Sequence, residues 1–235
     1  MSEGRKALGP FLDALDGALI DAAASAPDGE ATAGIRHLAE VTRSLDTTGE
    51  VPRLTTSRDV LPVCRFWDEA LHVARRAGVV LAPSLLTLGP ALSWTQNPNY
   101  RRHPPDPAFL DNYGYAVIVG PSDGPPALAV DPRIALGVLL LGPHTHYPLH
   151  HHPAVEVYYT MTPGGEWWRG DGPWRTEPAG TAIHHAPDVP HATRAGAGPL
   201  LAIYLWHGDL ATHARLGAAR SRSSAGRVDG ENVQR

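Results

Sequence analysis

The stretch PLHHHPAVEVYYT, residues 148–160, determines how the rest of this chain is interpreted. Side chains in an extended strand alternate between two faces, so residues an even number apart lie on the same face. Four side chains in this stretch share one parity, namely His150, His152, Glu156 and Tyr158. Imidazole nitrogens and carboxylate oxygens are common ligands of divalent metals. If the backbone stays extended past Pro153, the stretch predicts part of a metal site on one wall of a sheet.

A further ligand is expected from a different strand. His191 lies in the segment APDVPHATRA, after a turn signal that runs from Gly180 to Pro187, and it opens a short predicted strand. A histidine at such a junction between turn and strand can close a metal site across a barrel. The sequence therefore predicts His191 as the ligand that faces the first three.

Other histidines crowd the same region. Eight of the 13 histidines of the chain fall between His144 and His191. The sequence leaves open whether the remaining ones are solvated, hydrogen-bonded or close to the site; they are His144, His146, His151, His184 and His185. His151 has the wrong parity for the predicted wall, and no carboxylate follows His144 and His146 at a suitable interval.

The region after about Ser93 has the pattern of an all-β domain. Short β-branched or aromatic runs predict strands at residues 115–119, 134–141, 155–162, 166–169, 181–185, 191–194 and 200–206. The segments between them are rich in Gly and Pro, as in PSDGPP, TPGG and GDGP. Many short strands at this spacing predict an antiparallel sandwich or barrel.

The first third of the chain is predicted to be helical instead. Apolar residues recur at three- and four-residue steps in three stretches, from Leu8 to Leu19, from Ile35 to Leu45 and from Val60 to Val73. These helices are expected to pack on the barrel or to form a contact between two copies of the chain. We divide the chain into a helical extension (1–92), a barrel with the metal site (93–212) and a polar C-terminal tail (213–235).

Composition excludes several classes of protein. The formal net charge of −4 argues against a nucleic-acid binder, which would carry a basic face. No apolar run approaches the ~20 residues that span a bilayer, and the N-terminus does not resemble a signal peptide. The single cysteine, Cys64, excludes an internal disulfide, so a cytoplasmic location is expected.

The ligand spacing resembles the two motifs of the cupin superfamily. The first is His150-x-His152-x3-Glu156, and the second is Gly180-x6-Pro187-x3-His191. His144 stands where the family pattern has a glycine, and the second motif lacks its usual glycine and asparagine. The resemblance implies a mainly β fold, the cupin β-barrel or double-stranded β-helix. It also implies one divalent transition metal, with Zn, Fe, Mn, Co and Ni left open.

A closer resemblance is to the dimethylsulfoniopropionate lyases of the cupin superfamily, the type with a helical N-terminal extension. The matching residues are Tyr147, His150, His152, Glu156, Tyr158, His191 and Trp206. The resemblance extends to nearly the whole chain, with its specific residues between positions 147 and 206. It implies a carbon–sulfur lyase that converts a small zwitterion to dimethyl sulfide and acrylate by β-elimination.

That reaction assigns roles to the aromatic residues. A base must remove the proton α to the carboxylate, and a tyrosine beside a dication can act as its phenolate. Tyr158 is the expected base, with Tyr147 as the second catalytic candidate. Sulfonium cations bind over aromatic faces, and Tyr147, Tyr204 and Trp206 are expected to bind the substrate in this way.

Two other functions fit the same residues. A cupin-type non-haem iron dioxygenase would use similar ligands and would consume oxygen. A ligand-binding cupin without catalysis would turn over no small acid. The sequence does not decide the native metal, the substrate in vivo or the oligomeric state, for which a homodimer is one option.

Overall fold

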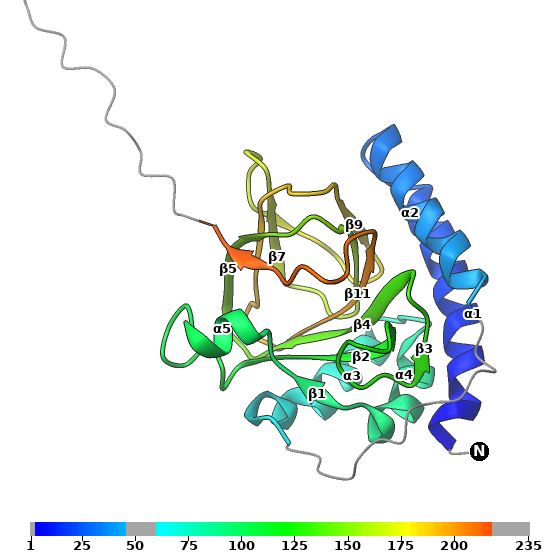
Figure 1. Cartoon of the computed structure of the whole chain (residues 1–235), viewed down its shortest axis with the longest axis horizontal. Helices are drawn as coiled ribbons and strands as arrows, with labels where there is room; N and C mark the ends of the chain where they lie inside the picture. The colour runs from blue at the N-terminus through cyan, green and yellow to red at the C-terminus, as the bar shows by residue number, and fades with distance from the viewer. Residues whose placement is uncertain (1–2, 46–59, 218–235) are drawn as a thin grey trace, which may run out of the picture.

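The computed structural model describes residues 3–45 and 60–217, which form a β-barrel with a layer of helices on one side (Figure 1). The helices and helical turns are α1 (Glu3–Ala23), α2 (Gly29–Arg43), η1 (Pro62–Phe66), α3 (Trp67–Arg76), α4 (Ala82–Leu88), η2 (Gly89–Ala91) and α5 (Pro98–Arg102). The three helical stretches predicted from the apolar periodicity are confirmed. The short helices α4 and α5 were not predicted.

The strands are β1 (Trp94–Thr95), β2 (Tyr113–Gly120), β3 (Ala129–Val130), β4 (Ile134–Leu141), β5 (His146–His151), β6 (Val155–Thr160), β7 (Glu166–Arg169), β8 (Arg175–Thr176), β9 (Ala182–His185), β10 (His191–Arg194), β11 (Leu200–His207) and β12 (Arg215–Leu216). All seven predicted strands are present, with ends that differ from the prediction by at most two residues. The cupin-type fold class is therefore confirmed.

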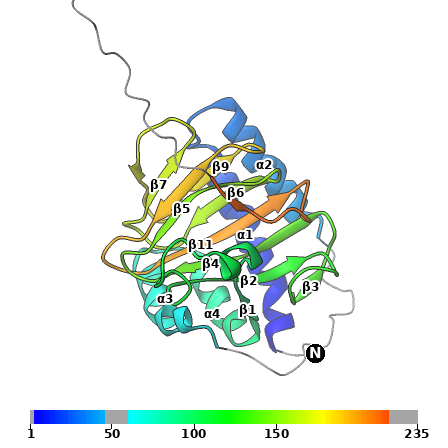
Figure 2. The same ribbon diagram turned by 60° about the vertical axis from the view of Figure 1, so that its left-hand side comes forward.

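Two sheets face each other to make the barrel (Figure 2). The seven-stranded sheet has the order β1-β2-β4-β11-β6-β9, with β3 beside β2, and the five-stranded sheet has the order β12-β5-β10-β7-β8. Strand β12 lies in the segment that we assigned to the C-terminal tail, and it pairs with β5. Residues 218–235 of that predicted tail lie outside the described residues.

The seven-stranded sheet is buried on both faces. Outward-facing residues such as Val157, Ile203 and Leu205 pack against the helices, whereas Tyr158 and Tyr204 belong to the aromatic cluster inside the barrel. This separation confirms the inward face predicted for Tyr158, and β11 alternates in the same way. Because both faces are covered, strands such as IALGVLLL in β4 are apolar throughout rather than alternating.

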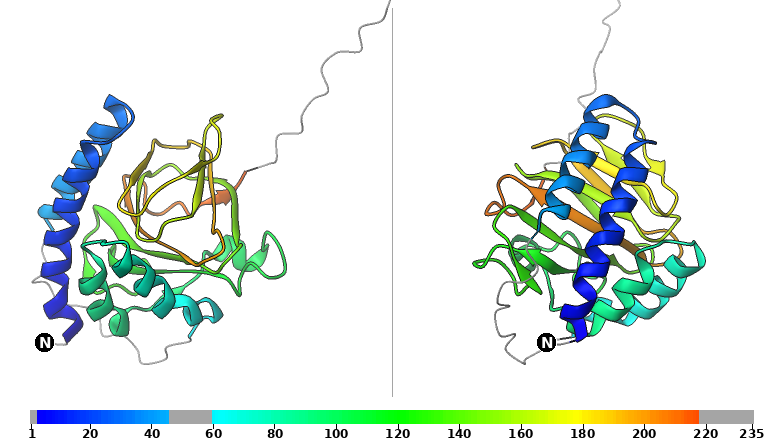
Figure 3. Two further views of the ribbon diagram at one scale, coloured as in Figure 1. Left: turned by 180° about the vertical axis from the view of Figure 1, so that it is seen from behind. Right: turned by 90° about the vertical axis from the view of Figure 1, so that its right-hand side faces the viewer.

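The helical layer covers the outer face of that sheet. Helices α1 and α2 lie side by side across it (Figure 3), and the apolar stripe of α1 is buried there. The structure thus places the helices against the barrel, as one of the two predicted arrangements requires. Among the described helices, none combines the length and apolar composition needed to cross a membrane.

His144 adopts a backbone conformation that glycine usually provides. Its φ is 59°, in the left-handed region, and its N–H donates to the carbonyl of Gly196 over 2.9 Å. Histidine is among the residues enriched in this region, although the conformation is uncommon for any non-glycine residue. The turn expected from the family pattern is therefore formed with a histidine in the glycine position.

Gly34 allows α2 to approach the barrel. A Cβ atom added at Gly34 would lie 2.4 Å from the imidazole of His184 on β9. We expect Gly34→Ala to lower the free energy of unfolding by about 1–3 kcal/mol, because overpacking of the interface outweighs the better helix propensity of alanine. Urea denaturation measures this change.

Gly17→Ala in α1 is the matched control, because nothing lies within 4 Å of its added Cβ. This substitution should stabilise the protein by about 0.4–1 kcal/mol. If Gly34→Ala raised the free energy of unfolding as much as Gly17→Ala does, the close approach of Gly34 to His184 would be contradicted.

Candidate active site

Two rows of polar side chains face each other inside the barrel. In the seven-stranded sheet, Glu156 of β6 is paired with Trp206 of β11 on one side and with His185 of β9 on the other. In the five-stranded sheet, His191 of β10 is paired with His150 of β5. The ladder between β10 and β5 shifts register between His191 and Thr193, a bulge of the kind that re-aims side chains near functional sites.

The condition that the backbone stay extended from His150 past Pro153 is not met. Strand β5 ends at His151 and β6 begins at Val155, so the chain changes sheets at the corner that contains Pro153. Proline cannot donate to a sheet ladder, which favours a break at this position. His150 and Glu156 therefore come from opposite sheets, and His152 lies in the corner between them.

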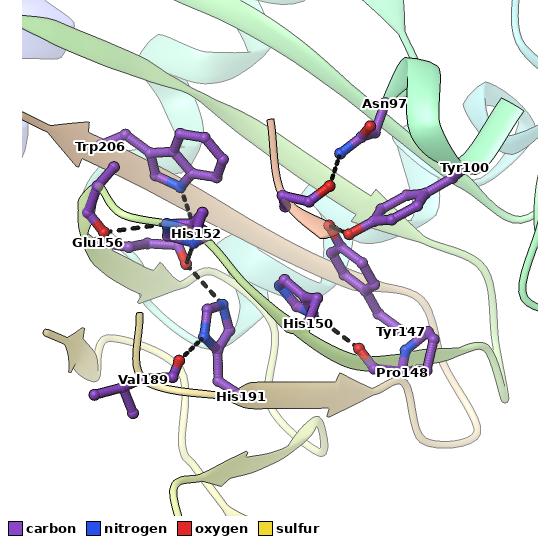
Figure 4. A network of polar contacts seen from close by, with 12 residues as sticks. Asn97, Tyr100, Tyr147, Pro148, His150, His152, Glu156, Val189, His191 and Trp206 are labelled. Atoms are coloured by element: carbon purple, nitrogen blue, oxygen red, sulfur yellow. Dashed lines mark hydrogen bonds and ion pairs between the residues drawn. The ribbon is translucent and has the colours of Figure 1, made fainter. Parts of the chain in front are cut away.

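The Glu156 carboxylate lies where these elements meet (Figure 4). Its Oε2 atom lies 3.0 Å from Nε2 of His152 and 3.0 Å from Nε2 of His191. Its Oε1 atom accepts a hydrogen bond from the indole N–H of Trp206 over 2.6 Å. The Trp206 ring also stacks on His152 with 4.0 Å between centroids. Both carboxylate oxygens thus have partners inside the protein.

His152, Glu156 and His191 each offer a potential ligand atom, and these atoms lie within 4.8 Å of one another. Backbone carbonyls fix the rings, since His191 Nδ1 contacts the Val189 oxygen at 2.8 Å and His152 Nδ1 contacts the Ala154 oxygen at 3.1 Å. This leaves both Nε2 atoms directed at the carboxylate. His191 Nε2 is buried and makes no well-aligned hydrogen bond among the described residues, despite its short distance to Glu156. Such an atom suits a metal ligand.

His150 lies beside this group rather than within it. Its ring meets that of His191 edge-on with 4.1 Å between centroids, and its Nδ1 contacts the Pro148 oxygen at 2.8 Å. Of the four predicted metal ligands, the structure therefore clusters His152, Glu156 and His191, with His150 adjacent to them.

The ionisation of these groups is compatible with metal binding. Burial opposes the charge on Glu156, but the charges of His152 and His191 and the hydrogen bond from His152 outweigh it and hold the carboxyl pKa well below its usual range. Burial, reinforced by the charge of His191, lowers the pKa of His150 well below its usual value. The site therefore combines a carboxylate with a neutral imidazole, the forms in which these groups bind metals.

Tyr158 and Tyr147 are both buried next to His152, Glu156 and His191, which we call the ligand group. Tyr158 is 4% exposed, and burial together with the negative charge of Glu156 raises the pKa of its hydroxyl well above the usual value. Tyr147 stacks on His150 with 4.1 Å between centroids, and its hydroxyl donates to Tyr100 over 3.2 Å. Without a further positive charge, both hydroxyls stay protonated.

A cavity of about 470 Å³, which we call the tyrosine cavity, opens beside these residues. Its aromatic lining consists of Tyr113, Tyr115, Tyr147, Tyr158, Tyr204 and Trp206. Glu156 is the one member of the clustered ligand group that lines it, and among its described lining residues there is no Lys or Arg. Gly137 makes room for one wall, because a Cβ there would lie 2.6 Å from the Tyr204 hydroxyl.

Sequence reasoning missed two features of this site. Tyr113 and Tyr115 line the tyrosine cavity from β2, yet they are distant in sequence from the histidine-rich stretch. The hydrogen bond from Trp206 to Glu156 depends on the β11–β6 register, which no sequence signal specified. The orientation of Trp206 therefore indicates a role in holding Glu156 that the prediction of substrate binding did not include.

Comparisons with known proteins identify relatives for most of the chain. Residues 33–202 match the model of the dimethylsulfoniopropionate lyase family. The dimethylsulfoniopropionate lyase DddQ of Ruegeria pomeroyi is 34% identical over 104 residues, which are 44% of this chain and 50% of that protein. The putative dimethylsulfoniopropionate lyase DddL of Cereibacter sphaeroides is 30% identical over 152 residues, 64% of this chain and 61% of that protein. The chain thus matches only about half to three fifths of the length of these curated relatives.

Solved structures of similar fold include lyases of the same kind. A chain from the crystal structures of the dimethylsulfoniopropionate lyases RdDddP and RnDddQII superposes with a TM-score of 0.61 at 20% identity, covering 92% of this chain and 100% of that one. The structure of DddQ from Ruegeria pomeroyi gives a TM-score of 0.57 at 20% identity, covering 80% of this chain and 94% of that one. At this identity the structures support the fold.

Trp206→Phe tests the anchoring of Glu156. Phenylalanine keeps an aromatic ring beside His152 but removes the only donor to Glu156 Oε1 in the described structure. Loss of a hydrogen bond to a charged group should lower the free energy of unfolding by about 1.5–3 kcal/mol. Denaturant unfolding of the metal-free protein measures it.

The control is Trp168→Phe on β7, because the Trp168 indole is half-buried and makes no hydrogen bond to the described part of the chain. This control should change stability by much less. If the two substitutions cost the same, the indole N–H of Trp206 contributes nothing specific.

Proposed function

The chain belongs to the dimethylsulfoniopropionate lyase family, and on this premise we propose that it is a metal-dependent carbon–sulfur lyase. Its substrate would be dimethylsulfoniopropionate, and its products dimethyl sulfide and acrylate, formed by β-elimination. The observation that carries this proposal is the tyrosine cavity, which joins Glu156 to two buried tyrosines and other aromatic faces.

The lining of the tyrosine cavity suits a small zwitterion that carries a sulfonium. Aromatic faces attract such a cation, by about 1–2 kcal/mol each when it is desolvated. Tyr147, Tyr204 and Trp206 are the proposed substrate-binding residues. No Lys or Arg is among the described lining residues and His213 is the one histidine there, so a bound metal would be the stronger positive partner for the substrate carboxylate.

We assign that partner to the ligand group. His152, Glu156 and His191, together with the adjacent His150, would hold one divalent transition metal. Bound there, it supplies Lewis-acid charge for the substrate carboxylate and favours the phenolate of Tyr158. The buried Nε2 atom of His191, which lacks a well-aligned hydrogen bond among the described residues, supports this assignment.

Tyr158 is the proposed general base. It shares a strand face with Glu156 and lines the tyrosine cavity. Its phenolate oxygen would accept the proton from the carbon α to the substrate carboxylate. The electron pair of that C–H bond forms the C=C bond of acrylate, and the C–S pair leaves on sulfur as neutral dimethyl sulfide. Tyr147, whose hydroxyl is oriented by Tyr100, is the second candidate for the base.

The remaining assignments stay predictions. They are the division into residues 1–92, 93–212 and 213–235, the cytoplasmic location and the homodimer. A dioxygenase of the same fold is distinguished by oxygen consumption during turnover, which the proposed elimination does not need.

Loss of His152 or His191 should weaken metal binding more than loss of His150 does. We expect His152→Ala and His191→Ala each to lower the affinity for Zn²⁺ or Co²⁺ at least about 100-fold, since each removes a direct ligand. His150→Ala should weaken binding too, by a smaller factor, because its ring lies outside the cluster. Competition with a coloured chelator, after removal of any affinity tag, measures these constants.

His103→Ala is a control within the same histidine-rich chain, because His103 lies outside the barrel strands, after α5. It should leave affinity unchanged. Full affinity in both His152→Ala and His191→Ala would place the metal elsewhere.

Headspace detection of dimethyl sulfide tests the function itself. Metal-loaded protein mixed with dimethylsulfoniopropionate should release dimethyl sulfide and acrylate in equal amounts without consuming oxygen. Tyr158→Phe removes only the hydroxyl, so kcat should fall by about 10²–10⁴ with little change in KM.

Metal content must be measured in the same preparation, because Tyr158 could also contact the metal. Near wild-type elimination by a metal-loaded Tyr158→Phe protein would exclude Tyr158 as the base and make Tyr147 the next candidate. No dimethyl sulfide from the wild type would contradict the proposed reaction.

A further inference from the structure

A second cavity, which we call the seam cavity, lies on the other side of the ligand group. Strand β9 ends the seven-stranded sheet, β8 ends the five-stranded sheet, and no ladder joins them in the described part of the barrel. A cavity of about 1130 Å³ opens at this seam. It is bounded by β7, β9, α1 and the first turn of α2, the helices that lie alongside the sheet in Figure 3.

The inner end of the seam cavity reaches His185. This residue lines the cavity and is 1% exposed. Its ring stacks on His191, with 4.1 Å between centroids and 13° between planes. Neither ring nitrogen of His185 has a hydrogen-bond partner among the described residues. Buried polar atoms usually have partners, so both ring nitrogens of His185 are available to a ligand that arrives from the cavity.

The outer part of the seam cavity is acidic. Its charged lining contains the carboxylates of Asp13, Asp21, Asp28, Glu30, Asp171 and Glu177. Two arginines, Arg169 and Arg175, also line it. The Arg169 guanidinium is engaged, because it donates to the carbonyl of His184 over 2.6 Å and lies 4.0 Å from Asp28. The excess of carboxylates attracts cations and concentrates them at the opening.

The tyrosine cavity is less suited to admit a metal ion. Neither His152 nor His191 lines either cavity, and the ring of Trp206, which lines the tyrosine cavity, covers one face of His152. Its wall is largely aromatic and apolar, with carboxylates only at Asp123 and Glu156. Apart from Asn97, Asp123, Glu156 and His213, a hydrated dication would exchange its water there for tyrosine hydroxyls and apolar groups. The seam cavity instead offers carboxylates at its opening and an imidazole at its inner end.

We propose that the seam cavity is the route by which a divalent metal ion reaches the ligand group, with His185 as a transient ligand just before His191. This inference rests on the metal part of the proposed function. The carboxylates draw the ion in, a free nitrogen of His185 replaces part of its hydration shell, and the adjacent His191 then takes it over.

The rate of metal uptake tests the route. Metal-free protein is mixed with Zn²⁺, and the loss of free Zn²⁺ is followed with a zinc-sensitive dye. His185→Phe should lower the association rate constant about tenfold or more, and the double variant Asp28→Asn, Glu30→Gln should lower it about threefold to tenfold at low salt. Asparagine retains the helix cap that Asp28 forms with the Ala31 N–H. The dissociation constant for Zn²⁺ should stay unchanged, because an entry route changes the rate constants of association and dissociation by the same factor.

Asp68→Asn with Glu69→Gln is the matched control. It changes the charge equally in the first turn of α3, at residues that do not line the seam cavity. This control should leave the uptake rate unchanged, and the effect of the Asp28 and Glu30 changes should shrink in 0.5 M salt, where the screening length falls to about 4 Å.

Three outcomes would overturn the proposal. One is unchanged uptake in His185→Phe, and another is equal slowing by the two double variants. The third is a weaker dissociation constant in His185→Phe comparable to that of His191→Ala, which would make His185 a permanent ligand. Failure of the metal-loaded wild type to release dimethyl sulfide would contradict the lyase reaction and leave the uptake comparison valid.

Discussion

A carboxylate removed from water must be balanced inside the protein, and Glu156, with 1% of its surface exposed, is such a group. Its partners come from three places in the chain: His152 from the corner between sheets, His191 from β10 and Trp206 from β11. These contacts of Glu156 persist only if the strands of both sheets keep their register and the two sheets keep their distance from each other. The geometry of the site therefore depends on how well the barrel itself is held.

The helical layer provides part of that support. The seven-stranded sheet carries Glu156, Tyr158 and Trp206 on its inner face, while its outer face is sealed by apolar contacts with the helices. An outer face left in water would expose the apolar side chains of β4, β6 and β11, so the sheet needs this cover. Burial on both faces also removes the polar alternation that normally specifies which face points inward.

Much of the fold could be predicted from local patterns in the sequence. Glycine- and proline-rich separators located the strands, and the parity shared with Glu156 assigned Tyr158 to the inner face. Parity failed between His150 and Glu156 because the chain changes sheets at Pro153, and parity is defined only within one strand. The contacts of Glu156 with Trp206 and His185 depend on the register between strands distant in sequence, which local patterns do not encode.

The arrangement around Glu156 separates two physical tasks. On the side of Tyr158 and Trp206, the tyrosine cavity is aromatic and suits an onium group that must lose water. On the side of His185, the seam cavity is rich in carboxylates and suits a hydrated ion that must keep oxygen ligands until the last step. A lining with as many carboxylates as the seam cavity would oppose the negative charge that develops on the substrate at proton removal, and the tyrosine cavity has only Asp123 and Glu156. Placing the two cavities on opposite sides of the ligand group resolves that conflict within a single small barrel.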